Sequence, residues 1–383
     1  MTVLAASLAG CATTRDTTEP PAELQVIEDQ VSVDVVWSRS TGDGSGQLRS
    51  AFQPVIVDDE LYTLDRDGFL IAMDKRTGDT RWSKKHRLRI SAGLAADDRQ
   101  LYAGTVDGQL VAFNRENGAI EWQMPLESEL IATPTSAFGN VVVHTVDGKI
   151  MAVNTTSGDL IWSYSHTVPA LSQRGSSRPL VSSGQVFVGS DDGRLIILSL
   201  NDGLLLWDGP VAVPSGRSDL ERMVDVDIQP VIVGSTLFAS ALNTRIIALD
   251  LREQRMLWRR DKSSYLELAV DEQYVYLIDG ASHVWALDRQ SGTTAWTQDD
   301  LNARPLSSPA LVDDRYVVVG DFAGYVHVLD IDNGEFVGRR KLSSDPYQTA
   351  PLVDENMAYF HNREGYLTAV RLTPATDRIA QRL

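Results

Sequence analysis

The side chains that could carry chemistry are few and scattered in this chain of 383 residues. No HxH or HExxH spacing brings two imidazoles to one metal ion. The six histidines are His86, His144, His166, His283, His327 and His361. Ser172, Ser176 and Ser177 lie in one segment, but no GxSxG sequence surrounds them to form a nucleophile elbow. The sequence therefore predicts no catalytic residues and a protein that is not an enzyme.

Metal and redox chemistry have equally weak support. Asp330-Ile331-Asp332-Asn333-Gly334 resembles half of a calcium loop. An EF-hand needs a bidentate Glu at its twelfth position, and that position holds Lys341. A single cysteine, Cys11, excludes a disulfide framework, a CxxC redox pair and a multi-cysteine zinc site. We expect no metal and no cofactor.

Charge and hydropathy exclude further classes. The formal net charge is −17, whereas nucleic-acid binding demands a basic surface. The same acidity disfavours adhesion to anionic lipid through charge alone. No apolar run approaches the roughly 18–20 residues of a membrane-spanning helix. The basic cluster at 84–89 ends a predicted outer strand, where charge commonly blocks edge-to-edge pairing; a partner patch is the alternative.

A repeat of about 40 residues sets the architecture. LYTLDRDGFLIAMDKRTGDTRW (61–82), LYAGTVDGQLVAFNRENGAIEW (101–122) and VVVHTVDGKIMAVNTTSGDLIW (141–162) align without a gap. Asp-Gly turns between β-rich runs indicate hairpins, and each copy contains four strand-like segments. Units of four strands at this period are propeller blades. The eight copies have their first turn at Gly68, Gly108, Gly148, Gly193, Thr244, Ser282, Gly324 and Gly365.

The ends of the repeat predict how the ring closes. The eighth copy has no tryptophan, yet VSVDVVWS at 31–38 resembles the outer strand of the other copies. We predict an all-β, eight-bladed β-propeller of four-stranded antiparallel blades over 31–371, closed by this N-terminal outer strand in the last blade. Pro374 should break any later strand, which leaves 372–383 as a tail. An open solenoid, with capping ends, is the alternative.

One repeat position holds seven of the eight tryptophans. They are Trp37, Trp82, Trp122, Trp162, Trp207, Trp258 and Trp296; Trp285 lies elsewhere, and the seventh copy has Gly338 instead. An indole at a constant place in every outer strand is expected to pack between adjacent blades, with its N–H on a fixed acceptor. A stacking platform for a ligand is the alternative.

The first residues resemble a lipoprotein signal. Leu8-Ala9-Gly10-Cys11 resembles the lipobox of bacterial lipoproteins, which implies a signal peptide at 1–10 and a lipid on Cys11. Signal peptides normally begin with Lys or Arg, and residues 1–3 have none, so either the start codon is placed late and the signal is truncated, or the match is accidental. A stretch rich in Thr, Glu and Pro follows, and predicts a flexible tether at 11–30, at most about 65 Å long. Ala12 resembles the residue that directs lipoproteins to the outer membrane.

The repeat A-x-[DN]-x-x-x-G-x-x-x-W resembles that of the pyrroloquinoline quinone (PQQ) propeller superfamily. That superfamily contains quinone-dependent dehydrogenases, which resemble one another in a vicinal cysteine pair and a calcium held by carboxylates. This chain has no cysteine pair. A PQQ-dependent dehydrogenase is therefore a competing hypothesis without positive support.

Two long connections stand in adjacent blades, at 163–178 and 208–229. Long loops on a rigid scaffold often carry function, with tolerated insertion as the alternative. PALSQRG at 169–175 and DLERMVDVD at 219–227 resemble paired motifs of the BamB family, the lipoprotein subunits of the outer-membrane β-barrel assembly (BAM) complex. The resemblance implies binding to the periplasmic POTRA domains of BamA. The residues carried over by position are Leu171, Gln173, Arg174, Asp225 and Asp227; Gln173 departs from the family's usual Leu.

These residues predict a docking site. Arg174 offers a rigid fork of donors, Leu171 an apolar anchor, and Asp225 and Asp227 share one side of an extended stretch. The alternative is that the two aspartates pair locally with Arg174 or Arg222.

The sequence thus predicts a non-catalytic scaffold at the periplasmic face of the outer membrane, held by its lipid. Its expected partners are BamA, other BAM subunits and nascent outer-membrane proteins, with no nucleic acid. A periplasmic binding module with a ligand in the central funnel is a third hypothesis.

Overall fold

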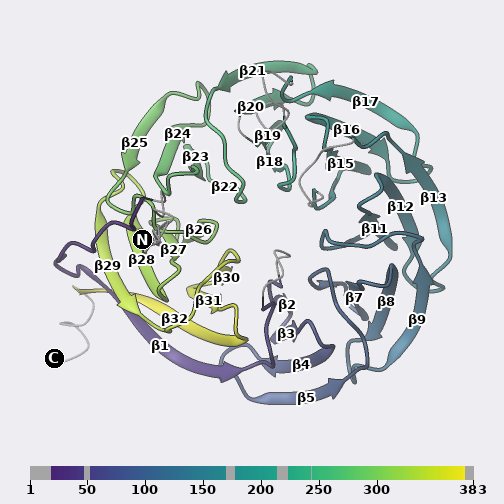
Figure 1. Ribbon diagram of the computed structural model, residues 1–383, viewed down its shortest axis with the longest axis horizontal. Helices are drawn as coiled ribbons and strands as arrows, with labels where there is room; N and C mark the ends of the chain where they lie inside the picture. Colours follow the sequence, from purple (N-terminus) through teal and green to yellow (C-terminus); the bar gives the residue numbers. More distant parts are fainter. Residues whose placement is uncertain (1–18, 47–51, 170–176, 214–222, 243, 376–383) are drawn as a thin grey trace, which may run out of the picture.

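The computed structural model describes residues 19–46, 52–169, 177–213, 223–242 and 244–375. They form eight four-stranded antiparallel sheets arranged as a ring (Figure 1). The predicted eight-bladed β-propeller is confirmed. Within the described ranges, no helix is long and apolar enough to cross a membrane.

The blades are numbered in chain order, each from its inner to its outer strand. Blade 1 contains β2 (Val55–Val57), β3 (Glu60–Leu64), β4 (Phe69–Asp74) and β5 (Thr80–Lys85). Blade 2 contains β6 (Ala95–Ala96), β7 (Gln100–Gly104), β8 (Gln109–Asn114) and β9 (Ile120–Pro125). Blade 3 contains β10 (Thr135–Ala137), β11 (Asn140–His144), β12 (Lys149–Asn154) and β13 (Leu160–Ser165). Blade 4 contains β14 (Leu180–Ser182), β15 (Gln185–Gly189), β16 (Arg194–Ser199) and β17 (Leu205–Pro210).

The second half of the ring repeats this order. Blade 5 contains β18 (Val231–Val233), β19 (Thr236–Ala241), β20 (Arg245–Asp250) and β21 (Arg255–Arg260). Blade 6 contains β22 (Ala269–Val270), β23 (Tyr274–Ile278), β24 (Val284–Asp288) and β25 (Thr294–Gln298). Blade 7 contains β26 (Ala310–Val312), β27 (Tyr316–Gly320), β28 (Tyr325–Asp330) and β29 (Phe336–Lys341). Blade 8 contains β30 (Leu352–Asp354), β31 (Met357–His361), β32 (Tyr366–Pro374) and, as its outer strand, β1 (Val31–Ser40).

The middle strands of each blade are buried on both faces, because every sheet packs between two others. β4 and β8, for example, each have four consecutive buried residues. Their turns follow local chemistry: Asp65 accepts hydrogen bonds from the backbone N–H groups of Asp67 and Phe69 (3.0 and 2.7 Å). Gly68 completes that turn with φ 81°, a value that glycine adopts without steric cost.

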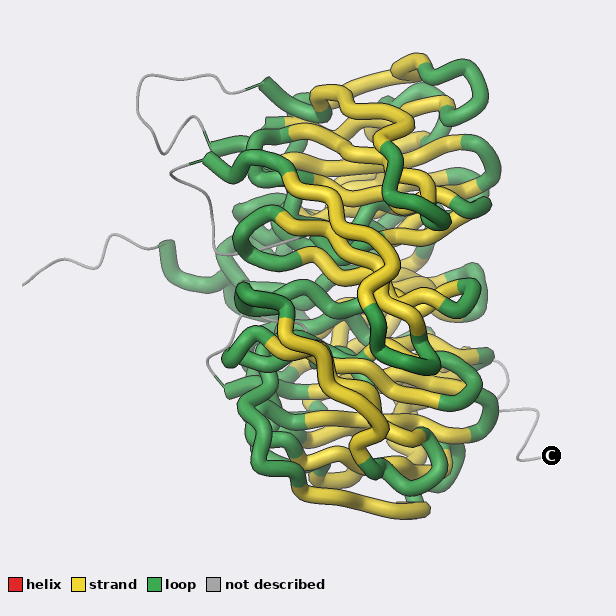
Figure 2. Tube along the Cα trace, turned by 90° about the vertical axis from the view of Figure 1, so that its right-hand side faces the viewer, coloured by secondary structure: helices red, strands yellow, loops and turns green. Residues whose placement is uncertain are grey.

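The ring has two distinct faces. Because the strands are antiparallel, every connection from an outer strand to the next inner strand emerges on the same face as the turns between second and third strands. We call this the connection face. The turns between third and outer strands lie on the opposite face. Figure 2 shows the ring from its rim, with the longer loops gathered on the left.

Six of the seven repeat tryptophans pack across a blade junction. Each ring covers the glycine that precedes the next blade's outer strand, and a Cβ on that glycine would lie 2.4–2.8 Å from the ring. The glycines are Gly78, Gly118, Gly158, Gly203, Gly292 and Gly334. Five of the six indoles also donate to a backbone carbonyl of that blade: Trp37, Trp122, Trp162, Trp258 and Trp296. Within the described residues, the buried N–H of Trp82 has no partner.

The junction between blades 4 and 5 departs from this pattern. The expected glycine of blade 5 is replaced by Gln254, which has φ 51°. The ring of Trp207 lies instead over its own strand, where a Cβ on Gly209 would meet it at 2.2 Å. The uniform packing predicted for the tryptophans therefore does not extend to Trp207.

The ring closes between the two ends of the chain. β1 pairs with β32 from Val31↔Pro374 to Ser40↔Tyr366, and Trp37 lies opposite Ala369. β32 thus runs to Pro374, beyond the predicted boundary at 371, because three more residues of β1 pair with it there. The proline is tolerated because it is the last residue of the strand.

The segment before β1 is not a free tether over its whole predicted length. The backbone N–H of Ala22 donates to Asn302 O (2.9 Å) and that of Gln30 to Val337 O (2.8 Å). Leu24 packs against a buried cluster of blades 6 and 7. The flexible tether predicted for 11–30 is therefore wrong for residues 22–30, which lie against the propeller.

Candidate functional site

The two long connections predicted to carry function converge at blades 4 and 5. The hydroxyl of Ser177, at the end of the first connection, donates to Ile228 O near the end of the second (3.0 Å). The amide of Gln229 donates to Pro179 O (3.0 Å). Their ends are thus joined on the connection face, as expected for neighbouring blades.

Three of the five predicted partner-binding residues, Leu171, Gln173 and Arg174, lie outside the described residues, as do Arg222 and the lipid-attachment candidate Cys11. The geometry of the site therefore rests on Asp225 and Asp227.

Asp225 and Asp227 alternate with apolar residues along an extended stretch. Val224 and Val226 are buried in the cluster between blades 4 and 5, and the N–H of Val226 donates to Ser190 O (3.1 Å). These contacts hold the stretch against the Ser190–Gly193 turn of blade 4. Asp225 is 1% exposed, whereas Asp227 is partly accessible.

This corner of the molecule concentrates negative charge. Burial, together with the neighbouring carboxylates of Asp225 and Asp191, raises the pKa of Asp227 to about 7. A carboxylate with a pKa near neutrality is destabilised in its charged form. A cationic group docking here would favour that charged form, which suits recognition of an Arg or Lys side chain.

Sequence analysis did not reveal an electrostatic interaction between Arg178, at the inner end of the first connection, and Glu267. Burial lowers the pKa of Arg178, which is opposed by the charge of Glu267, and burial raises the pKa of Glu267. Arg178 looks like an ordinary loop residue in the sequence because its partner belongs to blade 6, 89 residues later.

The histidines do not converge. His144 packs against His166 with ring centroids 5.6 Å apart, and burial lowers the pKa of His144 to about 4. His361 of blade 8 hydrogen-bonds to Phe52 O, just before blade 1 (3.0 Å). His86, which follows blade 1, hydrogen-bonds to Gly118 O of blade 2 (2.9 Å). Each imidazole is held by its own blade or the next one.

The donor set does not fit a quinone-and-calcium site. Among the described residues, no group of three or more His, Cys, Asp or Glu side chains could hold a metal ion. Asp330 accepts from the N–H of Asp332 (3.0 Å) and Asn333 from that of Glu335 (2.9 Å). The half-loop that resembles a calcium site is thus an ordinary turn of blade 7.

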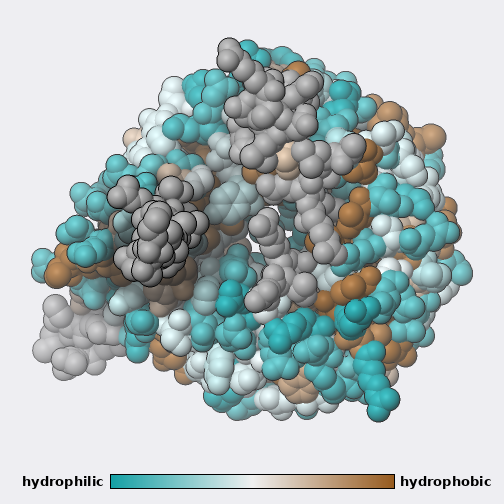
Figure 3. All heavy atoms as spheres, in the orientation of Figure 1, coloured by the Kyte–Doolittle hydropathy of each residue, from teal (hydrophilic) through white to brown (hydrophobic). Residues whose placement is uncertain are grey.

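The described residues visible on the connection face are mainly hydrophilic (Figure 3). Figure 3 shows the connection face, with hydrophobic residues gathered along the right-hand rim over the outer strands of blades 2 and 3. Ile120 of β9 and Leu160 and Ile161 of β13 are exposed hydrophobic side chains of these outer strands.

The chain matches a known protein family over most of its length. A family model described as "Outer membrane protein assembly factor BamB" matches residues 23–89 and 66–298. The outer membrane protein assembly factor BamB of Marinobacter adhaerens is 48% identical over 373 residues, covering 97% of this chain and 95% of that protein.

Solved structures agree on the fold. BamB from Moraxella catarrhalis has a TM-score of 0.81 and 25% identity, covering 88% of this chain and 99% of that one. Quinohemoprotein alcohol dehydrogenase from Comamonas testosteroni has a TM-score of 0.72 at 12% identity, covering 88% of this chain and 76% of that one. The second likeness concerns the fold alone.

Proposed function

Since the chain belongs to the BamB family of outer membrane protein assembly factors, we propose that it is a non-catalytic scaffold that binds the POTRA domains of BamA. The single observation that carries the proposal is the near-full-length match to that family. The convergence of two long connections beside a destabilised carboxylate, Asp227, supports the position of the site.

The proposed interface joins Leu171, Gln173 and Arg174 of the first connection to Asp225 and Asp227 of the second. Arg174 would pair with an acidic or carbonyl group of BamA, and Asp227 with a basic one. Asp225 is buried, so its role is to hold the second connection in place and to raise the pKa of Asp227.

The proposed location is the periplasmic face of the outer membrane, with a lipid on Cys11. There the scaffold would act with other BAM subunits to assist insertion of β-barrel proteins, and it would contact their nascent chains. Palmitate labelling should be lost in a Cys11→Ala variant, and the variant should leave the membrane fraction.

Copurification of BamA from solubilised envelopes tests the interface. Arg174→Glu should reduce captured BamA at least 30-fold, an interfacial loss of about 2 kcal/mol. Arg252→Glu is the matched control, because Arg252 is exposed on an opposite-face turn of blade 5 and undergoes the same charge change. Equal capture by the two variants would place the interface elsewhere. Reversal at Asp225 is unsuitable because that side chain is buried.

Catalysis has its own test. Purified protein supplied with PQQ and calcium should reduce no electron-acceptor dye above the rate of a heat-denatured sample. Dye reduction that depends on an alcohol would restore the dehydrogenase hypothesis.

A further inference from the structure

We propose that residues 19–30 form a strap fixed across blade 7, which brings the lipid anchor out at the connection face. The connection-face end of blades 6 to 8 is then the part of the propeller nearest the membrane. This inference deepens the proposed function and rests on lipid attachment at Cys11.

Contacts along the whole strap hold it in place. At its beginning, Asn302 donates to Glu19 (2.9 Å) and Arg304 donates to Ala22 O (3.0 Å). In its middle, Arg339 donates through a guanidinium N–H to Gln25 O (2.6 Å), and through its backbone N–H to Asp29 (3.2 Å).

The two arginines are themselves immobilised beneath the strap. Arg304 donates from Nε to the fully buried carboxylate of Asp321 (3.1 Å), and Arg339 from Nε to Nδ1 of His327 (3.0 Å). His327 in turn contacts Asp321 through Nε2 (3.2 Å). Each arginine thus joins the buried core of blade 7 to a backbone carbonyl of the strap. Since guanidinium forks lose little freedom on binding when already held, the strap docks onto preorganised donors.

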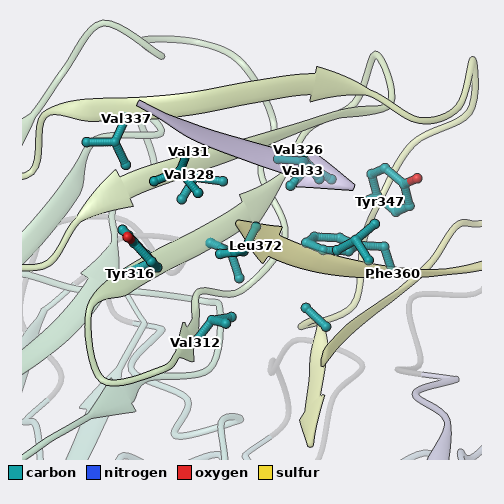
Figure 4. Close-up of a cluster of buried hydrophobic side chains, with 13 residues drawn as sticks. Val31, Val33, Val312, Tyr316, Val326, Val328, Val337, Tyr347, Phe360 and Leu372 are labelled. Carbon is teal, nitrogen blue, oxygen red and sulfur yellow. The ribbon is translucent and has the colours of Figure 1, made fainter. Parts of the chain in front are cut away.

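The N-terminal segment also explains why blade 7 has no tryptophan at the repeat position. A Cβ at Gly338 would lie 2.3 Å from Val31 O, so a larger residue there would collide with the chain where the strap becomes β1. Val31 and Val33 instead pack into the cluster between blades 7 and 8, beside Val328 and Val337 (Figure 4). The N-terminal segment therefore takes the place of an indole at this junction.

The course of the strap gives its direction. Its first contacts are to Asn302 and Arg304, in the connection between β25 and β26, on the connection face. Its last contact is to Val337 near the start of β29, toward the opposite face. The strap thus runs down the outer edge of blade 7, and its N-terminal end leaves at the connection face.

The free length of the anchor is correspondingly short. Glu19 is eight positions along the chain from Cys11, a distance of at most about 26 Å when fully extended. A wholly free tether over 11–30 would reach about 65 Å. The docked strap therefore removes more than half of the reach that would let either face turn to the membrane.

Hydrogen exchange of residues 19–30 in the full-length, detergent-solubilised protein tests docking without regard to lipid. Leu24→Ser should raise exchange of this segment at least tenfold, because Leu24 packs on blades 6 and 7. Val26→Ser is the matched control, since Val26 is fully exposed, and should change nothing. Unprotected residues 22–30 in the unsubstituted protein would overturn the strap.

Orientation is tested in vesicles that contain a spin-labelled lipid as quencher. A fluorophore is attached at Glu364→Cys, in a connection-face turn of blade 8, or at Asp332→Cys, in an opposite-face turn of blade 7. Quenching at position 364 should exceed that at position 332 at least twofold, and Leu24→Ser should abolish the difference. Equal quenching on vesicle-bound protein would overturn the orientation, whereas failure to float with vesicles would instead overturn lipid attachment.

Discussion

Two junctions of the ring lack the tryptophan–glycine contact, and they are built in opposite ways. Between blades 7 and 8, Gly338 replaces the tryptophan and the N-terminal segment fills the space. Between blades 4 and 5, Trp207 is present but its glycine is replaced by Gln254. A shallow pocket remains there, lined by Gln185, Ile197, Leu206, Trp207, Leu249, Leu251 and Gln254.

The carboxylates near these two junctions also differ, because the pKa of one is lowered and the pKa of the other is raised. Burial would raise the pKa of Asp321 in blade 7, but hydrogen bonds from His327 and Arg304 outweigh it and hold the pKa at about 2. Burial and like charges raise the pKa of Asp227 to about 7. Charged Asp321 is thus stabilised by its own hydrogen-bond partners, whereas charged Asp227 is destabilised at the blade 4–5 corner. A cationic partner would stabilise charged Asp227.

Truncating the tryptophans should give the largest difference between junctions. Trp162→Ala removes a side chain that is 7% exposed, together with its hydrogen bond to Leu200 O, and should lower the free energy of unfolding by about 4 kcal/mol. Trp207→Ala should cost about 2 kcal/mol, because that ring is less buried and lies over Gly209. Urea denaturation measures both, and equal losses would contradict the distinction between the junctions.

Removing one arginine should separate a buried ion pair from an accessible one. Arg304→Met leaves the fully buried Asp321 without its guanidinium and should cost about 3 kcal/mol. Arg194→Met breaks the more accessible pair with Asp208 in blade 4 and should cost less than about 1 kcal/mol. Thermal unfolding at neutral pH measures both losses. A similar change in melting temperature for the two variants would contradict the prediction.

The two carboxylates should give stability opposite dependences on pH. Asp227, with a raised pKa, favours folding below its unfolded pKa of about 3.9, and this contribution is lost as the pH rises through about 7. Asp227→Asn should therefore exceed the parent protein in stability by about 2 kcal/mol at pH 8, since solvent reaches part of the carboxylate. The advantage should vanish near pH 4.

Asp321 provides the matched contrast. Its lowered pKa gives a contribution that is present above about pH 3.9 and lost as the pH falls through about 2. Asp321→Asn should thus be destabilised most at neutral pH. Unfolding curves collected from pH 2 to pH 8 would contradict this account if both variants followed the same trend.

The repeat made the fold predictable because each blade carries its own turn and packing signals. Asp67-Gly68 and the regularly placed tryptophans are local features, and the N-terminal outer strand was found because Trp37 fits the same pattern. Residues 22–30 were misread because their composition is that of a linker. What holds them is the pair Arg304 and Arg339, about 280 and 310 residues away, which no local pattern reveals.

The candidate site was less predictable for the same reason. The lengths of the connections indicated blades 4 and 5, and the structure joins their ends through Ser177 and Ile228. Alternation predicted that both aspartates share one side of the stretch, but it could not show that Asp225 is buried. Gly338 in a tryptophan position was the one visible sign that something else occupies that junction.

Single substitutions at Gln254 and Gly338, one at each junction, should give small effects of opposite sign. Gln254→Gly relieves a positive φ and restores the surface on which a tryptophan packs, so it should stabilise the protein by about 0.5–1 kcal/mol. Gly338→Ala adds a Cβ that meets Val31 O at 2.3 Å and should destabilise it by about 1 kcal/mol. Differential scanning calorimetry resolves such shifts. If Gln254→Gly destabilised the protein, Gln254 itself would be holding Trp207 in its unusual position, and the blade 4–5 junction would be as internally satisfied as the closing one.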